Sequence, residues 1–140
     1  MNRAEWQKLA EEREADALAL LAASRWAGAY YVAGYAIECG LKSCVLVQLA
    51  SAPEVVYLEK KFSEKCWTHD LEDLVDLAGL AAVRAADTAT NLELRDNWKT
   101  VKDWSEQTRY ILKTEAQARN LVASAFNKPN GVFPWVKARW

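Results

Sequence analysis

The sequence predicts a single all-α domain over residues 1–140, folded as an up-and-down antiparallel bundle of four to five helices. Its composition favours helices, because Ala, Leu, Glu, Lys and Arg dominate and the chain has only 5 Gly and 3 Pro. Apolar residues recur at three- and four-residue steps, and no alternating strand pattern competes with them. With 51% hydrophobic residues, a chain of this length can bury a core without a metal or disulfide.

The first two predicted helices form the long part of the bundle. One runs from Arg3 to Ser24, and the next runs from Trp26 to Leu49 and is the most apolar, so we expect it at the centre. Charges at Glu38 and Lys42 argue against a membrane span for this segment. A stripe of small residues on it would allow close backbone approach, within the bundle or across a dimer; it consists of Ala29, Ala33, Ala36 and Gly40.

The middle of the chain is predicted to contain shorter helices. After Pro53, a short helix is expected over Glu54–Phe62. Thr68 is the expected N-cap of a third main helix, and Gly79 is its expected stop. Residues 80–90 are rich in Ala and do not distinguish helix from loop.

The C-terminal part returns to helical spacing. Apolar residues recur from Leu94 to Thr108, and Thr114-Glu115-Ala116-Gln117 matches a capping box that opens the last long helix. Asn130-Gly131 indicates a turn. A short terminal helix is predicted from Pro134 to Trp140.

The charge distribution is uneven. Residues 1–98 carry 10 Lys/Arg and 16 Asp/Glu, a net of −6, whereas residues 99–140 carry 8 and 3, a net of +5. Either the two parts complement each other, which is the favoured interpretation, or the basic part faces an anion. Tryptophan and basic residues alternate in that part, which suits base stacking and phosphate binding, but the alternative of core rings covered by basic stems is favoured.

Few residues are suited to catalysis or metal binding. The single histidine, His69, excludes paired-histidine metal sites, and Cys39 and Cys44 lie on different faces of their predicted helix. These two thiols and Cys66 are expected to behave as small hydrophobic residues. No glycine-rich phosphate loop or hydrolase motif occurs, so we expect no metal and no cofactor. The charged N-terminal segment is not of the secretory type, so we expect a cytoplasmic protein with reduced thiols.

Two polar groups nevertheless merit attention. His69 is a candidate general base, although a local hydrogen bond in the first turn of its helix is the favoured interpretation. Glu38 and Lys42 stand four residues apart in the order that favours an ion pair. Because their helix is apolar, that pair should be partly buried, and the alternative is a Lys42 that faces a phosphate.

Four segments, in order along the chain, resemble HEPN domains (higher eukaryotes and prokaryotes nucleotide-binding). Tyr30 to Lys42 (YYVAGYAIECGLK) resembles the second helix of that family, with its Glu three residues before Leu-Lys. Thr68 to Leu74 (THDLEDL) resembles the start of the next helix. Arg109-Tyr110 and Gly131 to Lys137 (GVFPWVK) resemble later family segments.

The resemblance implies a helical bundle that commonly forms a homodimer in prokaryotic toxin-antitoxin or defence systems, often beside a nucleotidyltransferase partner. Many such domains are metal-independent ribonucleases whose site is an Arg followed, after four to six residues, by a His. This chain departs from that motif, because Phe62, Ser63 and Glu64 stand where the Arg would precede His69. We therefore do not expect the ribonuclease activity to carry over.

Three functional hypotheses follow. The leading one is a non-nucleolytic, homodimeric HEPN-like domain that binds a nucleotide or RNA, or serves a nucleotidyltransferase, through Lys42, His69, Arg109 and Tyr110. The second is a metal-independent ribonuclease with a divergent site, in which His69 pairs with Arg25, Arg84 or Arg109. The third is a structural dimerisation or adaptor module that uses the stripe of small residues.

Overall fold

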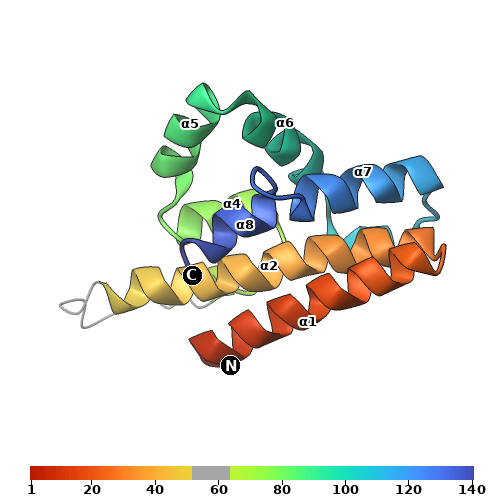
Figure 1. Ribbon diagram of the computed structural model, residues 1–140. Coiled ribbons are helices and arrows are strands. Elements are labelled where there is room, and N and C mark those ends of the chain that lie inside the picture. The colour runs from red at the N-terminus through yellow and green to blue at the C-terminus, as the bar shows by residue number, and fades with distance from the viewer. Residues whose placement is uncertain (52–63) are drawn as a thin grey trace.

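The computed structural model describes residues 1–51 and 64–140, and all regular structure within them is helical (Figure 1). The predicted helix Glu54–Phe62 lies outside the described residues. The described residues hold more helices than the four to five predicted, because the chain after Gly79 is divided into short segments. The elements are α1 (Arg3–Ala22), α2 (Trp26–Ala50), α4 (Leu71–Leu77), α5 (Ala81–Thr90), α6 (Leu92–Val101), the 3-10 helix η1 (Glu106–Tyr110), α7 (Glu115–Phe126) and α8 (Val132–Lys137).

Helix α2 is the centre of the fold, as predicted. It contacts α1, α4, α7, α8 and η1. Helix α1 lies along one side of it, and α4, α7 and α8 lie on the other side (Figure 1). By length and composition α2 could cross a membrane, but 61% of its most apolar window is buried against the rest of the chain, as in the core helix of a water-soluble bundle.

The predicted up-and-down order describes only part of the topology. Helices α1 and α2 are joined by a tight turn and run antiparallel (Figure 1). Helix α7, however, runs in the same direction as α2, because the chain returns through the arch of α4, α5 and α6 before α7 begins (Figure 1). The all-α class is thus correct, whereas the simple alternation of directions is not.

The stripe of small residues on α2 is used inside the chain. Ala29, Ala33 and Ala36 are fully buried. Gly40 faces Val136, and a Cβ added there would come within 2.9 Å of the Val136 side chain on α8. The stripe therefore does not lie at a surface, and the hypothesis that it forms a face between two copies is wrong.

Helix caps follow local side-chain chemistry, with one correction. The capping box at Thr114 is confirmed, with the Gln117 amide donating to Thr114 Oγ1 at 3.2 Å. The third main helix is capped by Asp70 and not by Thr68, because Asp70 Oδ1 accepts from the Asp73 amide at 3.0 Å. The stop at Gly79 is confirmed, and its φ of +69° is a conformation that glycine adopts without steric cost.

The predicted helical run from Leu94 to Thr108 is interrupted. Helix α6 ends at Val101, and Trp104 then packs against Gly34 of α2 with 2% of its surface exposed. Burying that indole takes the chain off the helical path, and η1 follows. The turn at Asn130-Gly131 is confirmed, and α8 begins at Val132, before Pro134.

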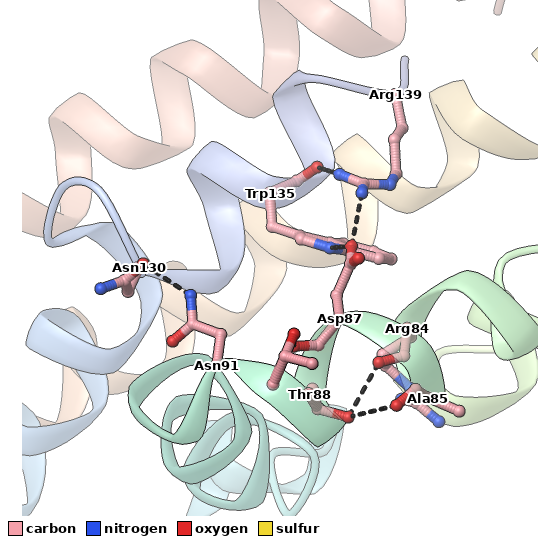
Figure 2. A network of polar contacts seen from close by, with 9 residues as sticks. Arg84, Ala85, Asp87, Thr88, Asn91, Asn130, Trp135 and Arg139 are labelled. Carbon is pink, nitrogen blue, oxygen red and sulfur yellow. Dashed lines mark hydrogen bonds and ion pairs between the residues drawn. The ribbon is translucent and has the colours of Figure 1, made fainter.

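A polar network fastens the arch to the C-terminal segment (Figure 2). Asp87 Oδ2 on α5 accepts from Trp135 Nε1 at 2.8 Å and from Arg139 Nη2 at 2.7 Å. The side-chain amide of Asn91 donates to Asn130 Oδ1 at 2.9 Å. Because α5 buries no residue completely, the two bonds to Asp87 contribute to its attachment to the bundle.

Replacing Gly34 by Ala tests the dependence on α2. The added Cβ would overlap the indole ring of Trp104, which is enclosed and has little room to shift. We expect Gly34→Ala to lower the free energy of unfolding by about 1–3 kcal/mol, measured by urea denaturation. Gly28→Ala is the control, because its Cβ would meet Leu20 at 3.4 Å, an ordinary contact. Equal stability of the two variants would contradict the close approach.

Candidate functional site

A buried carboxylate lies at the centre of the candidate site. Glu38 on α2 is 1% exposed, and its Oε1 accepts from Lys42 Nζ at 2.8 Å. The predicted partly buried ion pair is therefore confirmed, with 13% of the Lys42 side chain exposed. The Lys42 ammonium also lies 5.3 Å from the centre of the Trp6 ring on α1, which adds a cation–π contact. Lys42 is thus engaged on two sides within the protein.

The imidazole of His69 is held between two carboxylates. Its Nδ1 lies 3.0 Å from Glu38 Oε1, and its Nε2 lies 3.1 Å from Glu106 Oε2 on η1. A protonated imidazole donates to both carboxylates at once, whereas a neutral ring donates to only one of them. The favoured prediction of a local hydrogen bond is wrong, because both partners come from other helices.

The side chains of η1 form the outer part of the site. Arg109 is fully exposed, and its guanidinium lies 4.7 Å from the centre of the Tyr110 ring, which is 72% exposed. Tyr110 is the main cause of the raised pKa of Arg109, and Tyr31 and Glu106 contribute less. Glu106 and Arg109 are one turn apart on a 3-10 helix and so share a face.

The four predicted contact residues therefore fall into two pairs. Lys42 and His69 meet at Glu38, and Arg109 and Tyr110 stand on η1. Glu106 joins the two pairs, and sequence reasoning missed it. The signal for finding it was its spacing of three residues before Arg109, which becomes informative only once a 3-10 helix is known there.

The arginines considered as partners of His69 take different positions. Arg84 donates twice to Glu72 at 2.6 Å and stacks on Trp98, so its guanidinium is already occupied. Arg25 immediately precedes α2, and the rise of an α-helix puts it about 20 Å from Glu38. Arg109 alone of the three belongs to an element that touches His69. Among the described residues, the hydrogen-bond partners of the imidazole are carboxylates.

The cysteines do not add chemistry to the site. Burial, followed by the nearby Glu38 charge, raises the pKa of Cys39 to about 12. Burial likewise raises the pKa of Cys44 to about 12, and it raises the pKa of Cys66. The thiols of Cys39 and Cys44 are therefore protonated at neutral pH, as expected of small hydrophobic residues. In the part of the chain that the structure describes, no cluster of three His, Cys, Asp or Glu side chains could hold a metal ion.

Three of the four tryptophans from Trp98 to the C-terminus belong to the core, and Trp140 is partly buried against it. Trp98, Trp104 and Trp135 are at least nine-tenths buried, which removes them as platforms for base stacking. Basic groups cover the rings, as with Arg139, which lies 3.9 Å from the centre of the Trp135 ring. Lys137 also pairs with Glu11 at 3.0 Å. The favoured interpretations, core rings under basic stems and two complementary parts, agree with this packing.

No protein family, curated protein or solved structure matches this chain. The chemistry of the site must therefore be judged from its own geometry. An imidazole between two carboxylates can hold a proton and orient nearby groups. An exposed guanidinium beside an exposed phenol ring can bind an anion with an attached planar group.

A double-mutant cycle on Glu38 and Lys42 tests the buried pair. Lys42→Met leaves a buried carboxylate without its ammonium, and Glu38→Gln leaves the ammonium without its counter-charge, so each should destabilise the fold. We expect a coupling free energy of about 1–3 kcal/mol from denaturation of the single and double variants. The control cycle uses Glu115→Gln and Arg119→Met, whose pair is 55% and 57% exposed and should couple by about 0.5 kcal/mol or less. Equal coupling in both cycles would show that burial of Glu38 does not matter.

Proposed function

We propose that this chain is a HEPN-like helical domain that binds a nucleotide or a single-stranded segment of RNA without cleaving it. The observation that carries the proposal is the exposed pair of Arg109 and Tyr110 on η1, next to the Glu106 carboxylate that holds His69. A guanidinium binds phosphate oxygens, and an exposed aromatic ring stacks on a base. The all-helical fold and the order of the resembling segments support the family part of the proposal.

The electrostatics of His69 support binding over cleavage. Cleavage of RNA by acid–base chemistry needs a group with a free lone pair that takes up a proton from the 2′-hydroxyl. Both ring nitrogens of His69 instead face carboxylate oxygens. The charge of Glu106, whose side chain is 35% exposed, would also repel a phosphodiester that approached the imidazole.

Lys42 takes a different role in this proposal from the one that the sequence indicated. Its charge is already balanced by Glu38, and its stem and ammonium lie against Trp6. We therefore assign Lys42 a positioning role. It holds Glu38, which in turn orients the His69 ring and so places it against Glu106. The direct contacts are then Arg109 and Tyr110, with His69 at the edge of the same surface.

Binding of labelled oligouridylate to wild-type protein and to single variants tests the proposal. Because base stacking and phosphate contacts each contribute about 1–3 kcal/mol, Arg109→Ala and Tyr110→Ala should each weaken binding about tenfold or more. The control is Arg95→Ala, an exposed arginine on α6 whose loss should change the affinity by less than twofold. Absence of measurable binding by the wild type at low salt would refute the proposal.

A second candidate is a ribonuclease that uses His69, and one contact favours it. The bond between His69 Nδ1 and the buried Glu38 orients the ring, as a carboxylate orients the imidazole of a general base. Glu106, with 35% of its side chain exposed, would have to move away from Nε2. Under the leading proposal, wild-type protein and the Glu106→Gln variant leave RNA intact in gel assays. Cleavage by wild type that disappears in His69→Ala would establish the ribonuclease instead.

The assembly state belongs to the same proposal. We propose a cytoplasmic homodimer, or a complex with a nucleotidyltransferase, in a toxin-antitoxin or defence setting. Since the small-residue stripe of α2 is buried within the chain, any interface must use another face. Gel filtration with light scattering gives the mass of the assembly directly.

A further inference from the structure

A second surface feature lies at the turn between α1 and α2. A groove of about 350 Å³ opens there between the end of α1, the start of α2 and the segment before α7. Its lining combines apolar, hydroxyl and cationic groups, namely Leu20, Ser24, Arg25, Trp26, Ala27, Gly28, Leu112 and Lys113. None of these lining residues is acidic, so the groove favours an anionic ligand.

Aromatic rings lie beside cations in and next to the groove. The Lys113 ammonium lies 4.4 Å from the centre of the Tyr30 ring. Outside the lining, Arg119, which pairs with Glu115, lies 5.3 Å from the centre of the Trp26 ring. Arg25 is exposed immediately before the first residue of α2. A cationic groove bordered by an aromatic ring is the combination that binds single-stranded nucleic acid without sequence preference.

A short chain segment connects the groove to the proposed binding surface on η1. Lys113 is four residues after Arg109, so their Cα atoms are at most about 14 Å apart. The intervening side chains are exposed, and Leu112 is 92% exposed. Contiguous exposed apolar side chains of this kind are typical of interaction surfaces.

We infer that the groove extends the RNA site, an inference that rests on the proposed function above. One single strand contacts Arg109 and Tyr110 with one nucleotide and places a later phosphate between Arg25 and Lys113. The adjoining base then lies against Trp26 and Leu112. The observations that carry the inference are the two cations without an acidic neighbour in the lining and the short exposed connection to η1.

The test compares a uridine dinucleotide with a decanucleotide. In the Arg25→Ala/Lys113→Ala variant, decanucleotide binding should weaken about tenfold or more. The slope of log affinity against log salt should also fall by about 0.7, the value for one lost phosphate contact on a single strand. Dinucleotide binding at Arg109 and Tyr110 should stay within twofold of the wild type. The charge-reversed variant Arg25→Glu/Lys113→Glu should weaken decanucleotide binding further.

The control and the contrary outcomes separate the two proposals. Arg95→Ala/Lys99→Ala removes two exposed charges from α6 and should leave decanucleotide binding and its salt slope unchanged. Wild-type affinity and slope in the groove variant would overturn this inference and leave the proposed function standing. If the wild type binds neither oligonucleotide, both fail. If the groove substitutions weaken binding of an acidic peptide but not of RNA, the groove belongs to a protein partner and the inference is overturned.

Discussion

The fold depends on the close approach of five elements to one helix. Helix α2 can be surrounded because its inward positions carry Ala and Gly, which allow neighbouring elements to come within side-chain contact of its backbone. Gly34 receives the Trp104 indole, and Gly40 receives the side chains of α8. Each of these contacts places a more distant segment, η1 in the first case and the C-terminus in the second. The candidate site exists because η1 is held at this helix.

The buried carboxylate of Glu38 is the second feature on which the arrangement of the site depends. A carboxylate inside an apolar helix must be paired, because its desolvation would otherwise cost several kcal/mol. Lys42 supplies the pairing within α2, and His69 supplies it from the segment before α4. Glu106 then contacts the second ring nitrogen of His69, so that these four side chains link α2 to η1. The same contacts stabilise the arrangement and place a carboxylate oxygen against each ring nitrogen of His69.

The surface around these side chains differs in charge between its inner and outer parts. The inner part carries the carboxylates of Glu38 and Glu106, of which Glu38 is paired with Lys42. The outer part, from Arg109 to Lys113, is cationic and carries the exposed Tyr110 and Leu112. Under the proposed function, an anionic ligand is attracted to the outer part, and the Glu106 carboxylate keeps its phosphates away from the imidazole. The buried tryptophans of the C-terminal part contribute to stability, whereas the Tyr110 ring is exposed beside Arg109.

The sequence by itself determined the helical class, the central position of α2, the Glu38–Lys42 pair, the capping box at Thr114 and the stop at Gly79. These features depend on contacts within a few residues, or on the average polarity of a long segment, and both are legible in a linear pattern. Only the tertiary structure decided that the Ala and Gly stripe is internal and that α7 runs with α2. It alone brought Glu106 to His69 and Lys113 to Arg25. Such pairs are formed by residues far apart in the chain, and their meeting is set by how whole helices pack, which no local spacing records.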